Sequence, residues 1–164
     1  MFSTRKATLD DCQLIHDLAE RTFIPTYQYM HTPEQSDYMM NWMYSIESLT
    51  TQMKGKHTFF ILYKGEIPCG YLSVEEEGKD LFHLQKIYVL PEYQGTGAGK
   101  FLFEKAIQFI KEVHPEPCTM ELNVNRNNKA VHFYKKMGMK IAREGDFHIG
   151  NGYYMNDYIM SLDL

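Results

Sequence analysis

The sequence predicts a single mixed α/β (α+β) domain built on a mostly antiparallel sheet. Its 164 residues with 44% hydrophobic content suit one globular domain with a substantial core. Segments of strand-like alternation and segments of helical periodicity follow one another in the order β-α-α-β-β-β-α-β-α-β-β. No repeat, low-complexity tract or linker interrupts this order, so residues 1–164 are expected to form one domain.

The N-terminal third reads as one short strand and three helices. Residues 2–7 predict the strand, and Thr8 with Asp11 three positions later indicates a capping box before an apolar helical face. Thr32-Pro33-Glu34-Gln35 predicts the start of the second helix, with a hydroxyl at the N-cap and proline at the first helical position. A shorter helix over 49–53 is expected to end at Gly55. The apolar face of the second helix is expected to comprise Tyr38, Met39, Trp42, Met43 and Ile46.

The rest of the chain alternates strands and helices. Strands are predicted over 57–63, 67–74 and 81–90, with a hairpin at Lys64-Gly65-Glu66 and a solvated acidic turn at 75–80. Steering of cations is the alternative interpretation of the acidic run. Further elements are expected as a helix over 97–113, a strand over 118–124, a helix over 128–137 that stops at Gly138, and a hairpin of 140–149 and 153–164.

Composition excludes several function classes. A net charge of -4 argues against a nucleic-acid partner bound through its phosphates. The chain has no apolar stretch of about 18 residues and no signal-peptide core, so we expect a cytoplasmic protein with no membrane partner. Three widely spaced cysteines (Cys12, Cys69 and Cys118) predict a reduced chain without disulfides, and the absence of CxxC or histidine ligand spacing predicts no structural metal. The oligomeric state stays open, with a homodimer as one option.

The stretch "PEYQGTGAGK" at 91–100 raises the question of a phosphate ligand. A P-loop would need glycine where Gln94 stands and Ser or Thr where Phe101 stands, so that motif is excluded. A dinucleotide fingerprint counted from Gly95 would need its third glycine at Lys100, and it is excluded too. What remains is Gln94-x-x-Gly97-x-Gly99 between a strand and a helix, where backbone N–H groups can hold an anion; an ordinary glycine turn is the alternative.

Two segments together resemble a known family. Gln94-x-x-Gly97-x-Gly99 after "IYVLPEY" resembles motif A of the GCN5-related N-acetyltransferases (GNAT), and "NVNRNNKAVHFYKKMGM" resembles their motif B, with Asn127 and Tyr134 at its marked positions. The order of elements is similar to the family's over nearly the whole chain. The segment after "RTF" and the C-terminal "FHIGNGYYMNDYIM" look most like polyamine acetyltransferases of the PaiA type. The implied fold is a seven-stranded sheet flanked by about four helices.

The resemblance implies acetyl-CoA as co-substrate. Its pantetheine arm would pair with the backbone of Ile87, Tyr88 and Val89, and Asn127 would hydrogen-bond the arm or cap the following helix. The pyrophosphate would lie on backbone N–H groups of Gln94, Gly95, Thr96, Gly97, Ala98, Gly99 and Lys100. Lys100 supports this expectation, because a lysine in the first helical turn opposes the helix dipole unless an anion is bound.

The resemblance also assigns the chemistry. Tyr134 would donate a proton to the departing CoA thiolate, with packing on the core as the alternative role. The family's catalytic glutamate corresponds to His83, which can act as a base near neutral pH or serve as a structural strand residue. Glu121, His148 and a chain of waters are the other candidates for the base.

The acceptor is expected to be a small primary amine, with polyamines first. Five residues fall where the family binds its acceptor, and their aromatic faces and carboxylate suit a cation: Phe23, Tyr27, Tyr29, Tyr154 and Asp157. Regular alternation along a strand would put Tyr154 and Asp157 on opposite faces, so only one of them is expected to line the pocket. The alternatives are a protein or peptide N-acetyltransferase and a CoA-binding regulator without catalytic activity.

Overall fold

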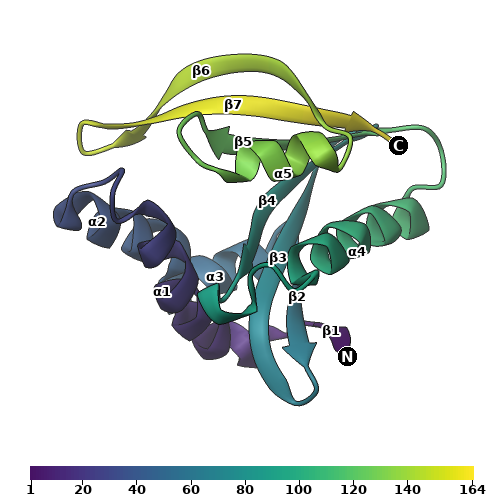
Figure 1. Ribbon diagram of the computed structural model, residues 1–164, viewed down its shortest axis with the longest axis horizontal. Helices are drawn as coiled ribbons and strands as arrows, with labels where there is room; N and C mark the ends of the chain where they lie inside the picture. The colour runs from purple at the N-terminus through teal and green to yellow at the C-terminus, as the bar shows by residue number, and fades with distance from the viewer.

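The computed structural model describes residues 1–164 and confirms the predicted class, one seven-stranded mixed sheet with helices packed on it (Figure 1). The strands are β1 (Phe2–Lys6), β2 (His57–Lys64), β3 (Ile67–Gly78), β4 (Leu81–Val89), β5 (Thr119–Asn125), β6 (Lys140–Gly150) and β7 (Tyr153–Asp163). The helices are α1 (Cys12–Tyr27), α2 (Pro33–Tyr44), α3 (Ile46–Lys54), α4 (Ala98–Val113) and α5 (Ala130–Lys136), with single 3₁₀ turns η1 (Leu9–Asp11) and η2 (Pro91–Tyr93).

The strand order is β1-β2-β3-β4-β5-β7-β6, and every neighbouring pair is antiparallel except β4 and β5. The parallel pair is short, because Leu81–His83 of β4 pair with Thr119–Glu121 of β5 and the two strands then diverge. Figure 1 shows the result, with β5, β6 and β7 forming the upper part of the sheet and β1 to β4 the lower part. The gap between the diverging strands positions the candidate site.

The helices cover both faces of the sheet around one hydrophobic core. On one face, the Tyr44 ring of α2 packs edge-on against Tyr71 of β3, with 6.0 Å between ring centroids. On the other face, Phe109 of α4 packs edge-on against Phe60 of β2 at 5.2 Å. Large aromatic side chains bury much apolar area, so these contacts are main stabilisers of the layers.

The predicted turn over 75–80 is wrong for most of its length, because β3 continues to Gly78. The backbone of Glu75 pairs with His57 of β2 and with His83 of β4, so the acidic run lies in the sheet. The Glu75 carboxylate accepts a hydrogen bond from Gln85 Nε2 at 2.8 Å. Local charge density predicted a solvated turn, whereas backbone pairing of Glu75 and Glu76 with neighbouring strands keeps this part of the run in β3.

The second helix ends earlier than predicted, and Ile46 does not belong to it. α2 stops at Tyr44, and the Ser45 hydroxyl caps α3 by accepting the Ser48 N–H at 3.1 Å. Ile46 and Trp42 are largely exposed instead of lying on a buried apolar face. A serine N-cap restarts the helix in a new direction, and hydrophobic periodicity alone could not reveal this break.

None of the helices is both long enough and apolar enough to span a membrane. The three cysteines are free and buried.

Candidate active site

The glycine turn lies between β4 and α4 and has the geometry of an anion site. Gly95 has φ of 77° and Gly97 has φ of 90°, a region that other residues rarely occupy. A Cβ atom at Gly97 would meet no atom within 4 Å, so the space beside this backbone is open. The helix begins at Ala98, and the N–H groups of its first turn have no acceptor within the helix. Backbone N–H groups and helix dipole therefore face an accessible space, which suits a phosphate.

The side chains of the turn stabilise the turn itself. Gln94 Nε2 donates to the Val89 carbonyl at 3.3 Å, and the Thr96 hydroxyl donates to the Tyr93 carbonyl. Gly99 lies against the Phe133 ring of α5, at ordinary contact distance for an added Cβ. These contacts leave main-chain groups as the available donors. Lys100 is exposed and lies 3.9 Å from Glu104, one helical turn later.

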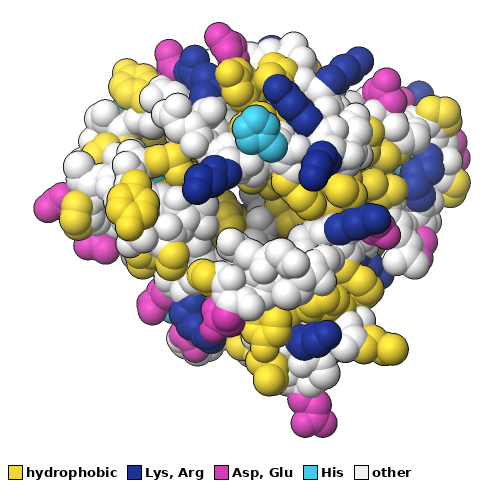
Figure 2. All heavy atoms as spheres, viewed as in Figure 1, with side chains coloured by type: hydrophobic (Ala, Val, Ile, Leu, Met, Phe, Trp, Pro, Cys, Tyr) yellow, Lys and Arg dark blue, Asp and Glu magenta, His cyan; other side chains and the backbone are white.

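Figure 2 shows a hollow in the middle of the face where Figure 1 places α5 above the start of α4. Several Lys and Arg side chains surround its rim in that view. Exposed lysines occur on both elements, since α4 carries Lys100 in its first turn and α5 carries Lys135 and Lys136 in its last turn. Positive charge around a hollow attracts anionic ligands.

One edge of β4 is open beside this hollow. Ile87, Tyr88 and Val89 pair with β3 on one side, whereas β5 pairs only with Leu81–His83 on the other. An extended amide chain could hydrogen-bond to this free edge as an added strand would. The residues present therefore fit the amide-rich arm of coenzyme A.

Tyr134 of α5 is buried beside the same gap. Its ring lies 5.4 Å from the Phe133 ring and 6.3 Å from the Phe103 ring of α4, between centroids. Burial raises the pKa of its hydroxyl, and the nearby Tyr27 adds to the shift, so the group keeps its proton at neutral pH. The structure gives this hydroxyl no hydrogen-bond partner. A protonated hydroxyl without a protein acceptor is available to a ligand.

Two further tyrosine hydroxyls meet close by. Tyr27 of α1 and Tyr88 of β4 have hydroxyl oxygens 3.4 Å apart. Burial raises the pKa of both hydroxyls, and their mutual proximity raises that of Tyr88 further. Both groups therefore stay neutral and can donate or accept hydrogen bonds.

Asp157 of β7 is a buried carboxylate near these hydroxyls. It is only 1% exposed; Oδ2 accepts a hydrogen bond from Asn123 Nδ2 at 3.2 Å, and Oδ1 has no partner. Burial raises the pKa of Asp157, while the Asn123 hydrogen bond and the nearby Arg126 and His83 side chains act in the opposite direction. The charge of Asp157 in turn contributes to the raised pKa of Tyr27. A buried carboxylate with a free oxygen is costly to keep, and a cationic ligand would offset that cost.

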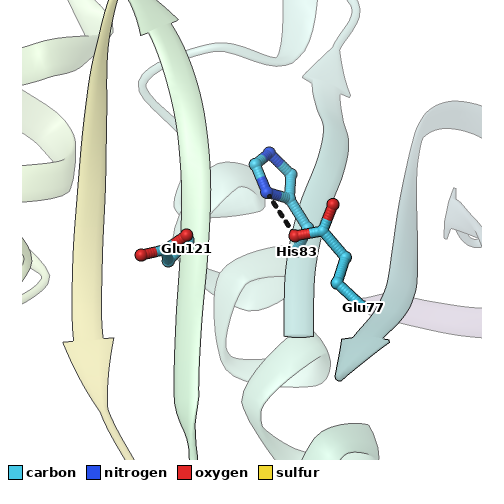
Figure 3. A group of neighbouring side chains, drawn as sticks. All are labelled: Glu77, His83 and Glu121. Carbon is cyan, nitrogen blue, oxygen red and sulfur yellow. Dashed lines mark hydrogen bonds and ion pairs between the residues drawn. The ribbon is translucent and has the colours of Figure 1, made fainter. Parts of the chain in front are cut away.

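His83 lies where β4 and β5 part, and it is 9% exposed. Its Nδ1 is 3.2 Å from Glu77 Oε1 of β3, as the dashed line in Figure 3 marks. Glu121, its register partner on β5, accepts two hydrogen bonds of 3.0 Å from Arg143 of β6. Glu121 is thus engaged by a guanidinium, which makes it a weaker candidate for the base than His83. His148, the other candidate, is exposed on β6 with its ring 5.1 Å from the Tyr154 ring.

A cleft of about 560 Å³ lies beside the α1–α2 connection and the β6–β7 hairpin. Its lining contains no charged residue and four amide side chains; it consists of Tyr29, Met30, His31, Gln35, Asn125, Asn127, Gly152, Tyr153, Tyr154 and Asn156. Tyr29, Tyr154 and Asn127 were predicted site residues, and this cleft brings them together. Phe23 is a core residue and does not line the cleft. Of the two competing candidates on the last strand, Tyr154 lines the cleft, whereas Asp157 is buried outside its lining.

Asn127 does not cap the following helix. Its neighbour Asn128 accepts the Ala130 N–H at 2.9 Å through Oδ1, so Asn128 makes the capping contact. Asn127 is exposed and lines the cleft.

Sequence reasoning missed several polar residues of this region. Glu77 contacts His83 from the preceding strand, β3, and Arg143 contacts Glu121 from β6, 22 residues later. Lys86 is buried on β4, where its Nζ donates to Gln52 Oε1 at 2.7 Å, and burial lowers its pKa to about 8. A lysine in the middle of a predicted strand was the available signal for a buried charge.

Comparisons with known proteins identify the family. Residues 27–160 match the family model of the acetyltransferase (GNAT) domain. The chain is 35% identical over 102 residues to an uncharacterised N-acetyltransferase of Mycobacterium bovis, which covers 62% of this chain and 64% of that protein, less than two thirds of its length. It is also 35% identical over 76 residues to the peptidyl-lysine N-acetyltransferase YjaB of Escherichia coli, covering 46% of this chain and 44% of that protein.

Solved structures share the fold. The PaiA N-acetyltransferase from Thermoplasma acidophilum, determined in complex with coenzyme A, has a TM-score of 0.82 at 22% identity, with 100% of this chain and 99% of that chain covered. The ribosomal-protein-S18-alanine N-acetyltransferase from Escherichia coli has a TM-score of 0.74 at 18% identity, with 99% and 94% covered. Since the family model covers most of the chain, the protein belongs to the GCN5-related N-acetyltransferase (GNAT) family, whose co-substrate is acetyl-CoA.

Proposed function

We propose that this protein transfers the acetyl group of acetyl-CoA to a primary amine and holds the amine's ammonium form at Asp157. The observation that carries the proposal is the free Oδ1 atom of this buried carboxylate. Natural sequences keep such unfavourable groups mainly at functional sites. An ammonium ion would supply the missing hydrogen bond together with a compensating charge.

The donor side rests on main-chain groups. The N–H groups of the Gly95–Gly97 turn and of the first turn of α4 would hold the pyrophosphate, and the open edge of β4 would pair with the pantetheine arm. Acetyl-CoA supplies an acetyl thioester that an unprotonated amine can attack. Asn127 is exposed and lines the cleft beside the β6–β7 hairpin, where its amide would hydrogen-bond the pantetheine arm.

Two side chains would handle protons. His83 accepts a proton from the amine, and Glu77 orients its ring through the contact at Nδ1. Tyr134 donates a hydrogen bond or its proton to the sulfur as CoA leaves, for which its neutral, unpartnered hydroxyl is suited. The raised pKa of Tyr134 supports a role as donor and not as base.

For the acceptor we propose a small aliphatic amine first, with polyamines as the class to test. A single carboxylate beside two tyrosine hydroxyls suits one ammonium group on an aliphatic chain. The second candidate is a peptide amine, and the cleft lining favours it. Its four amide side chains (Gln35, Asn125, Asn127 and Asn156) can both donate and accept, as a peptide backbone requires.

A thiol-release assay over an amine panel tests the proposal. The panel contains spermidine, free lysine, a peptide with an internal lysine and a peptide with a free N-terminus. Asp157→Asn removes the charge while it keeps the shape, and the loss of a charge-assisted hydrogen bond of about 1.5–3 kcal/mol should raise KM roughly tenfold to a hundredfold. Asp163→Asn, at the exposed end of the same strand, is the matched control.

The outcomes separate the candidates. Turnover of spermidine alone supports the polyamine class, and turnover of the peptides alone supports the peptide class. If Asp157→Asn keeps the KM of the wild type for every accepted amine, the proposed role of Asp157 is wrong. If acetyl-CoA raises the thermal midpoint but no amine releases thiol, the protein is a CoA-binding regulator instead.

A further inference from the structure

Glu77, His83 and Glu121 form a cluster of metal-ligand type where β3, β4 and β5 meet. Their nearest ligand atoms all lie within 4.8 Å of one another, and each residue comes from a different strand (Figure 3). His83 and Glu121 are buried, while Glu77 is exposed, so solvent reaches the cluster from the Glu77 side. The acetylation chemistry proposed above uses His83 as the base and Glu77 to orient its ring, and it gives Glu121 no role.

The spacing of the donor atoms is close to that of a coordinated ion. Ligand atoms bound to tetrahedral zinc at about 2.0–2.1 Å are about 3.3–3.4 Å apart. His83 Nδ1 and Glu77 Oε1 are already 3.2 Å apart. The Glu121 carboxylate, within 4.8 Å of the other two ligand atoms, has to approach. One imidazole nitrogen with two carboxylates suits zinc and similar divalent transition metals better than magnesium or calcium.

Arg143 competes with a metal ion for the Glu121 carboxylate. Two carboxylates and a neutral imidazole would balance a divalent charge, but Arg143 holds both oxygens of Glu121 at 3.0 Å. The Arg143 side chain is 56% exposed, so its guanidinium can turn into solvent when another cation takes its place at Glu121. Arg143 can therefore release Glu121 to an incoming ion, and metal binding becomes an exchange between guanidinium and metal.

We propose that Glu77, His83 and Glu121 bind a divalent transition-metal ion of the zinc type, and that this ion reversibly inhibits acetyl transfer. Coordination takes the Nδ1 lone pair of His83 and leaves the proton of the neutral ring on Nε2, so the ring has no free lone pair to accept the proton of the amine. No bond is broken and no redox step is required. The inhibitory part of the proposal rests on the proposed function, whereas the binding part does not.

Binding is measured directly on the purified chain, with Co²⁺ as a visible-absorption probe and Zn²⁺ as its competitor. The wild type should bind one Co²⁺ ion with the absorption of a low-coordinate site, and Zn²⁺ should displace it. Glu77→Gln and Glu121→Gln should each weaken binding roughly tenfold or more. Glu76→Gln, at the exposed neighbouring position of β3, should leave the affinity unchanged. Arg143→Gln should tighten binding severalfold, because it frees Glu121.

Three results would overturn the metal site. They are no stoichiometric Co²⁺ binding to the wild type, wild-type affinity for Co²⁺ in Glu77→Gln and Glu121→Gln, or weaker binding in Arg143→Gln than in the wild type. To test inhibition, the initial rate of acetyl transfer with Zn²⁺ is compared with the metal-free rate of the same protein. Zn²⁺ should reduce the rate of the wild type at concentrations that leave the rate of Glu77→Gln unchanged. Equal inhibition of both would refute the inhibitory role. If no amine is acetylated while Co²⁺ binds as described, the proposed function fails and the metal site stands.

Discussion

Gly97 allows the anion site to be tested against a matched position. Its φ of 90° means that alanine there costs about 1–2 kcal/mol of backbone strain, although a Cβ meets no atom within 4 Å. Gly65, in the hairpin between β2 and β3, has φ of 62° and is equally open. Gly97→Ala and Gly65→Ala should therefore each lower the thermal midpoint by roughly 2–8 °C in the absence of ligand.

The two variants should differ in their affinity for coenzyme A. The new methyl group at Gly97 projects into the space that a phosphate would occupy, and the loss of one charge-assisted hydrogen bond costs about 1.5–3 kcal/mol. We expect Kd to rise roughly tenfold to a hundredfold for Gly97→Ala and to stay unchanged for Gly65→Ala. Titration calorimetry with coenzyme A measures both. Wild-type affinity in Gly97→Ala, or an equal loss in Gly65→Ala, would refute the phosphate role of this turn.

Three further predictions follow from the buried polar groups. Tyr134→Phe should lower kcat by about 10²-fold with little change in acetyl-CoA affinity, and a wild-type kcat would show that solvent protonates the thiolate. Folding raises the pKa of Asp157, so ionisation of this carboxyl lowers the stability of the protein as pH rises above the pKa of the unfolded chain, near 4. Asp157→Asn should therefore raise the thermal midpoint at pH 7, and this gain should vanish in acid. Lys86 has a pKa of about 8 in the folded protein and 10.5 in the unfolded chain. The stability of the wild type should therefore rise between pH 8 and pH 10.5 relative to that of Lys86→Met. Thermal midpoints of the two proteins that change in parallel with pH would contradict this.

Local patterns predicted most of the fold and the place of the glycine turn, and they selected candidates for the donor side of the site. Glycines followed by a helical pattern located the turn before α4, and motif spacing selected Tyr134 from twelve tyrosines. The patterns failed where pairing between strands decides the structure. The acidic run begins inside β3 because Glu75 pairs with both β2 and β4, and Arg143 meets Glu121 because β7 pairs with both β5 and β6 and lies between them. Such contacts depend on the register of the paired strands, which local patterns do not specify.

The short pairing of β4 with β5 has a consequence for how the protein opens. Since three residue pairs are the whole backbone connection between β1–β4 and β5–β7, the sheet consists of two leaves that can separate without breaking either ladder. Backbone amides of the C-terminal leaf should then exchange with solvent as one cooperative group, below the free energy of global unfolding. A ligand that contacts both parts of the sheet would stabilise their association. Slower amide hydrogen exchange across β5, β6 and β7 would then report ligand binding, even at residues that the ligand does not contact.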